Sequence, residues 1–257
     1  MLNYKTVKYF FISAFVGLAI ARFFVSFPLP YFLWLGAWLL LTICGSGLIQ
    51  WNYFFKSLHS NPNVKGNHVA ITFDDGPDPL HTPKVLTLLE KYQAKATFFC
   101  IGTQVEAYPE VFKSIVAAGH TVGNHTYSHS KSFGFFKTQQ VIKELEVTDT
   151  LIQEVSGHTP LLYRPAFGVT NPKIKKALET TKHTSVGWNK RSLDALPYSE
   201  NFCYNRVTKN LKKGDVILLH DTSEKSIAVL ERLLLFLETK QMQSVTVDTL
   251  LNIQPYA

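Results

Sequence analysis

Ile71-Thr72-Phe73-Asp74-Asp75-Gly76-Pro77 is an apolar run that ends in two adjacent carboxylates and a turn. The run from His68 to Phe73 has the length and composition of a buried strand, and Gly76 and Pro77 then turn the chain. Two neighbouring carboxylates repel each other and resist burial without a counter-charge. Because a fold keeps such a pair where a metal ion or a reacting substrate uses it, we expect a functional site at the end of this strand.

Strand-like and helix-like stretches alternate around and after this run. Short apolar runs predict strands at 69–73, 96–101, 121–123, 161–163, 185–188, 216–219 and 244–247. Helical periodicity is found at 82–92, 108–118, 137–155, 172–181, 200–211 and 226–240. Such alternation predicts an α/β fold with a parallel sheet covered by helices. About seven strand–helix units indicate a small or incomplete (β/α) barrel, with an open doubly wound sheet as the alternative.

The N-terminal region has a different composition. Residues 1–60 contain no Asp or Glu, and their only basic residues are Lys5, Lys8, Arg22 and Lys56. Apolar runs at about 9–27 and 31–51 flank a proline pair, and the second is long enough to cross about 30 Å of hydrocarbon. We therefore expect a membrane anchor with one or two transmembrane helices at 1–60, a polar linker at 61–67 and a globular domain at 68–257.

Three arrangements of the N-terminal region are possible, and they place the globular domain on different sides of the membrane. Lys5 and Lys8 favour a cytoplasmic N-terminus. Two spans would return the chain to that side, which agrees with Lys56 and Lys65, whereas one span would place the domain outside. Ala19-Ile20-Ala21 also has the form of a signal-peptide cleavage site. An extracytoplasmic domain is expected if the substrate is a wall glycan, and a cytoplasmic one if both spans insert.

The charge of the chain does not suggest a nucleic-acid partner. Four of the 26 Lys and Arg residues lie in 1–60, which leaves 22 against 19 acidic residues in 61–257. These basic residues form no cluster that would indicate nucleic-acid binding. Cys44, Cys100 and Cys203 have neither disulfide-framework nor zinc-finger spacing, and we expect buried thiols at the first two.

Polar residues follow most of the predicted strands. Asp74 and Asp75 follow the first, and the others are His125, His129, Arg164, Asp194, His220 and Asp221. In a (β/α) barrel the carboxyl ends of the strands form the face that carries the active site. We therefore expect these side chains to lie together.

His125-Thr126-Tyr127-Ser128-His129 has the HxxxH pattern of a metal site. A spacing of four places both imidazoles on one side of a helical turn, about 5–6 Å apart at Cβ. Two histidines and one carboxylate leave open positions on a metal, as in catalytic sites. One aspartate of the pair would complete the ligands, and the other would take a proton from metal-bound water.

Three further residues have both a catalytic and a simpler interpretation. Arg164 would orient the carboxylate base, with a surface salt bridge as the alternative. His220 would act as a general acid, although a histidine after an apolar strand can also be part of the core. Asp194 would tune that histidine or cap a loop. Together these groups predict metal-assisted hydrolysis of an amide or ester.

Four motifs identify a family resemblance over about residues 66–250. Thr72–Pro77, His125–His129, Arg164–Gly168 and Leu218–Asp221 resemble the first, second, third and fifth motifs of the polysaccharide deacetylases. These are the NodB-homology domains of carbohydrate esterase family four. The resemblance implies a distorted (β/α) barrel. It also implies a hydrolase of carbon–nitrogen bonds other than peptide bonds, acting on an acetylated glycan or amino sugar.

The resemblance also implies a role for each motif residue. Asp74 would be the catalytic base paired with Arg164, and His220 the general acid. The backbone N–H of Phe167 would stabilise the oxyanion, and Leu218 would line the acetyl pocket. A divalent ion, usually zinc with cobalt, nickel or manganese as alternatives, would be bound by Asp75, His125 and His129.

Two positions depart from the family pattern. The fourth motif commonly reads Asp-Trp, and here it is Asp194-Ala195, so one wall of the usual groove is missing. The third has Ala166-Phe167 where Pro-Tyr is frequent, but the oxyanion contact is a backbone group and is retained. No metal or proton-transfer position is altered.

We therefore expect a membrane-anchored, metal-dependent deacetylase. It would remove N-acetyl, less readily O-acetyl, groups from an envelope polysaccharide or amino sugar. The alternatives are a deacylase of a lipid-linked sugar and an inactive glycan-binding domain.

Overall fold

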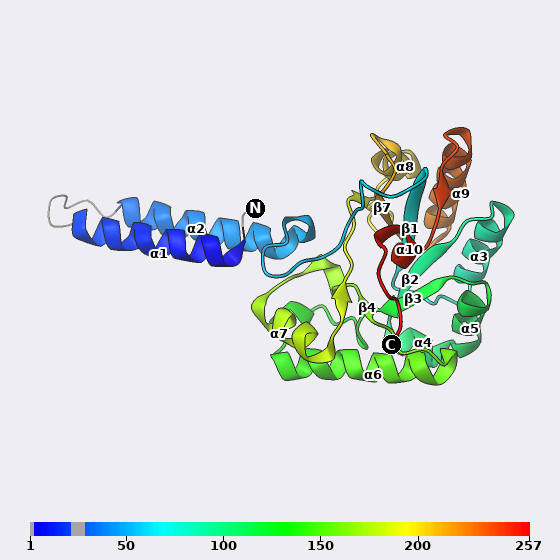
Figure 1. The fold of residues 1–257 in the computed structure, drawn as a ribbon, viewed down its shortest axis with the longest axis horizontal. Coiled ribbons are helices and arrows are strands. Elements are labelled where there is room, and N and C mark those ends of the chain that lie inside the picture. Colours follow the sequence, from blue (N-terminus) through cyan, green and yellow to red (C-terminus); the bar gives the residue numbers. More distant parts are fainter. Residues whose placement is uncertain (1–2, 22–28) are drawn as a thin grey trace.

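The computed structural model describes residues 3–21 and 29–257, and their centre is one curved parallel sheet (Figure 1). Its strand order is β5-β4-β3-β2-β1-β7-β6, with β8 paired to the start of β1. The strands are β1 (His68–Asp74), β2 (Ala96–Cys100), β3 (Thr121–Asn124), β4 (Leu162–Tyr163), β5 (Thr184–Ser185), β6 (Lys190–Arg191), β7 (Val216–His220) and β8 (Gln243–Ser244). Among these strands β5 and β6 are not paired to each other, so the barrel stays open. The predicted incomplete (β/α) barrel is confirmed, and the doubly wound alternative is wrong.

Most helices lie around the outside of the sheet (Figure 1). The helices of the barrel are α3 (Thr82–Lys91), α4 (Gly102–Ala107), α5 (Pro109–Ala117), α6 (Thr138–Ser156), α7 (Pro172–Thr181), α8 (Glu200–Thr208), α9 (Glu224–Thr239) and α10 (Val247–Leu251). The last of these packs on the inner face of the sheet, where Val247 and Leu250 share an apolar cluster with Ala70. Short 3₁₀ turns lie at η1 (Ile49–Trp51), η2 (Phe133–Phe135) and η3 (Ala166–Gly168). The sequence predicted α3, α5, α6, α7, α8 and α9 to within a few residues but missed α4 and α10.

Alternation along β1 places its side chains on two opposite faces. Val69, Ile71 and Phe73 pack with side chains of α3 and α9 in the largest apolar cluster. Thr72 and Asp74 lie on the other face, inside the barrel, where both contact Arg164. Parallel pairing with β7 sets Asp74 beside His220. The strand that carries Asp74 therefore lies inside the sheet, between β2 and β7.

Two predicted strands are wrong in part. The run 185–188 forms only the end of β5, and the chain reaches β6 after residues 186–189. Arg164 explains this break, because its Nε and Nη2 bind the carbonyl oxygens of Val186 and Gly187 at 3.2 and 3.0 Å. Those carbonyls are thus lost to strand pairing. The run 244–247 also ends early, since Val247 begins α10 and its N–H donates to Thr97 Oγ1 at 2.9 Å.

The N-terminal region forms a helical hairpin that projects from the barrel (Figure 1). Its helices are α1 (Tyr4–Ala21) and α2 (Leu29–Gly47). Tyr31 Oη donates to the Leu18 carbonyl at 2.6 Å, and Trp34 Nε1 donates to that of Phe11 at 2.9 Å. The two helices are thereby held antiparallel along their length.

Within the described ranges, α2 is the one helix long and apolar enough to cross a membrane, a test that a signal sequence also passes. The predicted first span, 9–27, lies partly outside the described residues. The predicted second span, 31–51, ends too late, because the α-helix stops at Gly47 and Ile49 is buried against the barrel.

The hairpin joins the barrel through polar contacts at its base. Ser46 Oγ donates to the Thr170 carbonyl at 2.7 Å, and Thr170 N–H donates back to the Ser46 carbonyl at 2.9 Å. Gln50 Nε2 donates to the Trp188 carbonyl at 3.0 Å. Further along, Leu58 N–H donates to Ser185 and Asn61 N–H to Gly214. The predicted boundaries at 60/61 and 67/68 stay predictions, and the chain before them already contacts the barrel.

Candidate active site

A cavity of about 200 Å³ opens at the carboxyl ends of the central strands. Seven of the nine predicted site residues line it: Asp74, Asp75, His125, His129, Phe167, Leu218 and His220. The other two, Arg164 and Asp194, are buried and hydrogen-bonded to lining residues. The fold therefore brings together side chains from distant parts of the sequence.

Asp75, His125 and His129 form a group that can hold a metal ion. Asp75 Oδ1 lies 3.4 Å from Nε2 of each histidine, and one ligand atom from each residue lies within 4.8 Å of the others. Buried polar atoms are almost always hydrogen-bonded. Asp75 Oδ1 and His129 Nε2 are buried here without any partner among the described residues. Two nitrogens and one carboxylate oxygen suit zinc or a similar divalent ion, so these residues fit such an ion.

The loop between the two histidines is not the helical turn that the spacing predicted. Thr126 and His129 have positive φ angles of 68° and 44°, and no helix is assigned there. Glu144 of α6 holds this loop, accepting hydrogen bonds from the N–H groups of Tyr127 and Ser128 at 3.1 and 2.8 Å. The imidazoles thus converge through a fixed irregular loop, and sequence reasoning missed Glu144.

His125 is oriented by the backbone of the third motif. Its Nδ1 lies 2.9 Å from the Arg164 carbonyl oxygen. Since a carbonyl only accepts, Nδ1 carries the proton, and Nε2 presents its lone pair toward Asp75. Metal-binding histidines are commonly oriented in this way.

The charges of this group perturb its titration. Burial alone would raise the pKa of Asp75, but the neighbouring imidazoles of His125, His220 and His129 outweigh it and hold that pKa well below its ordinary value. Burial alone would lower the pKa of His125, but the charges of Asp74 and Asp75 raise it instead. Burial and the neighbouring His125 lower the pKa of His129.

Asp74 is paired with a fully buried arginine. Arg164 Nη1 donates to Asp74 Oδ1 and to Thr72 Oγ1, both at 2.7 Å. The guanidinium also lies 4.1 Å from the centre of the Phe99 ring, a cation–π contact. With the two carbonyl contacts already described, every nitrogen of the guanidinium is bonded. Asp74 therefore has a counter-charge and a fixed orientation, and its second oxygen remains near His125, at 3.9 Å from Nε2.

His220 and Asp194 form a second pair on the β7 side of the cavity. Asp194 Oδ1 accepts from His220 Nδ1 at 2.8 Å, and Oδ2 accepts from the His220 N–H at 2.9 Å. Ser192 Oγ also donates to Asp194 at 2.6 Å. Burial lowers the pKa of His220, but Asp194 outweighs this and raises that pKa to about 9. The other ring nitrogen, Nε2, lies 3.8 Å from Asp75 Oδ2, so a cationic imidazole faces the cavity.

Several wall residues were not foreseen from the sequence. They are Gly168, Trp188, Arg191, Leu193 and Leu196. The Trp188 ring packs on Gly168, where a Cβ atom would come within 2.6 Å of it. Trp188 ended a predicted strand, and this position was a usable signal. Ala195, which replaces the common motif tryptophan, also lines the cavity.

Phe167 lines the edge of the same cavity, and the centre of its ring lies 4.4 Å from that of the His129 ring. The residue has a positive φ of 58°, and 47% of its surface is exposed. A substrate would therefore meet this ring beside the predicted metal ligands.

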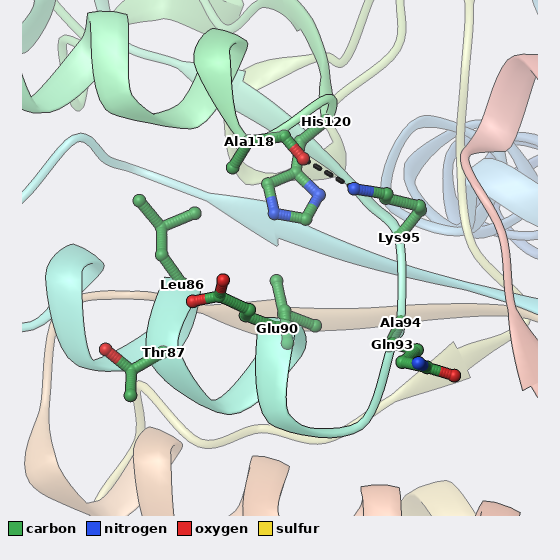
Figure 2. Close-up of a pocket in the computed structure, with 9 residues that line it drawn as sticks. Leu86, Thr87, Glu90, Gln93, Ala94, Lys95, Ala118 and His120 are labelled. Atoms are coloured by element: carbon green, nitrogen blue, oxygen red, sulfur yellow. Dashed lines mark hydrogen bonds between the residues drawn. The ribbon is translucent and has the colours of Figure 1, made fainter.

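A second hollow, of about 570 Å³, lies between α3 and the end of α5 (Figure 2). Lys95 Nζ donates to the Ala118 carbonyl there at 2.6 Å. His120 Nδ1 accepts from the Ala96 N–H at 3.3 Å. Burial, and then the charge of Lys95, lower the pKa of His120 to about 4, so this histidine is neutral near pH 7. None of the predicted site residues lines this hollow, and we assign it no chemistry.

The chain is similar in sequence to known proteins. The sequence profile of the family described as polysaccharide deacetylase matches residues 61–186. A peptidoglycan-N-acetylglucosamine deacetylase of Bacillus cereus is 36% identical over 192 residues, which cover 72% of this chain and 88% of that protein. The peptidoglycan-N-acetylmuramic acid deacetylase PdaC of Bacillus subtilis is 32% identical over 190 residues, 74% of this chain and 39% of PdaC.

A solved structure shares the fold. The crystal structure of the Bc1960 peptidoglycan N-acetylglucosamine deacetylase superimposes with a TM-score of 0.72 at 32% sequence identity. The match covers 78% of this chain and 95% of that one.

Proposed function

The chain belongs to the polysaccharide deacetylase family and is a carbohydrate deacetylase, and we propose that it removes N-acetyl groups from an amino sugar of peptidoglycan. The relatives named above carry out this class of reaction on N-acetylglucosamine or N-acetylmuramic acid. The observation that carries the proposal is a pair of buried atoms, Asp75 Oδ1 and His129 Nε2, that have no hydrogen-bond partner in the described part of the chain. They lie between two separately supported proton-transfer groups, Asp74 and His220.

Asp75, His125 and His129 would hold a divalent ion, for which zinc is the first candidate. When bound, such an ion polarises the acetyl carbonyl and lowers the pKa of a water molecule. The three side chains are already oriented for this task, since His125 is fixed by the Arg164 carbonyl and the loop carrying His129 is held by Glu144.

Asp74 and His220 divide the proton transfers between them. Asp74 takes a proton from the water that attacks the acetyl carbonyl, and Arg164 keeps its carboxylate in place at 2.7 Å. His220 gives a proton to the amide nitrogen as the carbon–nitrogen bond breaks, so that acetate and a free amine leave. Asp194 keeps His220 cationic before that step.

Two further residues would complete the acetyl site. The backbone N–H of Phe167 would stabilise the developing oxyanion, and Leu218, which is 2% exposed on β7, would contact the methyl group. Ala195, in place of the common tryptophan, lines the cavity beside Leu196. The smaller side chain would favour a substituted sugar over a flat unbranched chain.

A lipid-linked amino sugar is the second candidate substrate. The observation that favours it is the hairpin of α1 and α2, which we propose is embedded in the membrane. A hairpin returns the chain to its starting side, and Lys5, Lys8 and Lys56 near its base favour the cytoplasmic face. A sugar on a lipid carrier would reach the cavity there, whereas a wall glycan requires the opposite orientation. The intact proton-transfer groups argue against an inactive glycan-binding domain.

The test is acetate release by the full chain in detergent or vesicles. N-acetylglucosamine oligomers, isolated peptidoglycan and a lipid-linked N-acetylamino sugar would be compared. Acetate release from any of these, abolished in Asp74→Asn, would support the proposal, and the preferred substrate would separate the two candidates. The proposal would be contradicted if the metal-loaded chain released acetate from none of the three substrates. A reporter fused to the C-terminus would establish the side of the membrane.

A further inference from the structure

A large cavity lies at the base of the hairpin, away from the active site. We call it the basal pocket. Its volume is about 810 Å³, and it lies between the start of α1, residues 52–56 and α7. None of its lining residues also lines the active-site cavity. Figure 1 shows α7 at the side of the barrel from which the hairpin projects.

The basal pocket has a strong surplus of positive charge. Five lysines and one acidic residue line it: Lys5, Lys8, Lys56, Lys175, Lys176 and Glu179. Glu179 pairs with Lys175 at 3.9 Å. Among the described residues the other four lysines make no ion pair. Lysines brought together from three segments repel one another, so the pocket is complementary to an anion.

The floor of the basal pocket is aromatic. Tyr53 and Phe54 are buried there, packed with Tyr4 and with Val7 and Phe11 of α1. Tyr9 stands at the rim and is 65% exposed. Tyrosine rings of this kind are enriched where a protein crosses the membrane–water interface. The site therefore combines a cationic rim with an apolar, ring-lined base.

An exposed apolar surface continues from the rim along the hairpin. Phe10 and Ile12 of α1 are 66% and 48% exposed, and Phe15 and Val16 follow on the same helix. A soluble anion such as a nucleotide would use the lysines but not this surface. An anion attached to acyl chains would use both, since its chains could lie along α1.

We propose that the basal pocket binds the phosphate headgroup of an anionic phospholipid of the bilayer that surrounds the hairpin. Lysines near a membrane surface attract anionic lipids, and basic pockets beside membrane helices bind their headgroups. The inference rests on the hairpin being embedded in a membrane and is independent of the deacetylase chemistry. The bound lipid would join α1 to α7 of the catalytic barrel.

The experiment measures lipid binding to the full chain in a neutral detergent. The probes are a short-chain phosphatidylglycerol, the phosphatidylcholine with the same chains, and inorganic phosphate. Binding would be followed by ³¹P NMR and by the shift of the unfolding temperature. We expect saturable binding of phosphatidylglycerol, with phosphatidylcholine and phosphate each at least about tenfold weaker.

Two pairs of variants locate the site. Lys8→Gln with Lys176→Gln should weaken phosphatidylglycerol binding about tenfold or more, because each lysine near a bound headgroup contributes to its affinity. Lys143→Gln with Lys209→Gln, exposed lysines outside the pocket, should leave it unchanged. If the first pair fails to fold, Lys5→Gln with Lys56→Gln takes its place. Acetate release is measured in parallel and should be the same in all variants.

Three results would overturn the inference. Equal binding of phosphatidylcholine would mean that the pocket does not distinguish an anionic headgroup from a zwitterionic one. Equal binding of inorganic phosphate would mean a plain anion site without lipid. Equal weakening by the control pair would mean diffuse attraction rather than a pocket. If the wild-type chain binds the lipid but releases no acetate, only the proposed function is contradicted.

Discussion

Arg164 Nη1 lies 2.7 Å from Asp74 Oδ1, and the arginine is fully buried. The two residues come from β1 and from the end of β4. Removing charge from one member of a buried pair leaves the other uncompensated, which is far more costly than losing an exposed pair. This ion pair is therefore a structural element, and it also orients the carboxylate that we propose as the catalytic base.

Arg164→Met should destabilise the fold by about 3–5 kcal/mol, because Asp74 would stay buried without a counter-charge. Acetate release should also fall steeply. Denaturant unfolding and the rate at saturating substrate would measure the two effects.

Arg232→Met is the matched control. Its ion pair with Glu200 has the same 2.7 Å distance, but both side chains are over a third exposed, so we expect a loss below about 1 kcal/mol. Equal losses in the two variants would show that burial of the Arg164 pair does not matter.

Variants of the two adjacent aspartates should differ in the amount of metal that they bind. Asp75→Asn should lose most of the bound metal, because it removes a charged ligand of the predicted site. Asp74→Asn should retain the metal and lose activity by about 10²–10⁴-fold, the usual contribution of a general base. Metal content by elemental analysis, with acetate release, would check this. Full metal content in Asp75→Asn would refute the ligand assignment.

Asp194→Asn should move the alkaline limit of activity to lower pH. The wild-type histidine is cationic up to about pH 9 because Asp194 outweighs burial. Without that charge, burial dominates, and the pKa of His220 should drop. We expect about a hundredfold loss at pH 8 and a smaller loss at pH 6. Ser192→Ala, which keeps the carboxylate, should shift the profile less. Unchanged profiles would rule out this positioning role.

Asp221→Asn tests a buried carboxyl behind the first motif. Burial raises the pKa of Asp221 to about 7, despite the hydrogen bond from Thr82. Since this folded-state pKa is above the unfolded value of 3.8, wild-type stability from this group is fully present below about pH 4 and is lost as pH rises to about 7. The asparagine variant should therefore gain stability relative to wild type across this window.

Asp78→Asn is the control of opposite sign. Burial alone would raise the pKa of Asp78, but hydrogen bonds from His81 and Leu80 lower it. The contribution of Asp78 to the free energy of unfolding is present above the ordinary pKa of the group and is lost as pH falls. Unfolding free energies from pH 3 to pH 8 would compare both variants, and parallel slopes would contradict the assignment.

Shortening the chain tests the predicted domain boundary. A chain beginning at His68 would lose Ile49, which is 3% exposed in the cluster around Trp188, and the Leu58–Ser185 hydrogen bond. We expect it to be less stable than a chain beginning at Gly45 by at least about 2–5 kcal/mol, the cost of removing one buried aliphatic side chain. Equal denaturant midpoints for the two chains would support a domain boundary at the predicted linker, residues 61–67.

The sequence was most informative where local pattern and function coincide. β1, β7 and the metal-ligand candidates follow from buried runs that end in polar residues. The pair of short strands β5 and β6 does not, because a local pattern cannot reveal that Arg164 occupies the carbonyls of Val186 and Gly187. The irregular loop of the HxxxH motif likewise depends on Glu144, which lies on the following helix, α6, and belongs to no motif.

The pocket walls were harder to foresee for the same reason. Arg191 and Leu193 belong to no motif, and they line the cavity because β6 pairs with β7 beside Leu218. Leu196 stands beside Ala195, where the family commonly has tryptophan. Such residues are set by the path of the chain in space, which spacing alone does not encode.

The hydrogen bonds of Ser46 to Thr170 and of Gln50 to Trp188 join the end of α2 and the following 3₁₀ turn to loops near the active site. If the hairpin is embedded in a membrane, as we propose, these contacts would hold the cavity at a fixed distance from the membrane surface. The enzyme would then act on acetylated sugars held at that distance, and sugars in the outer layers of a wall would lie beyond its reach.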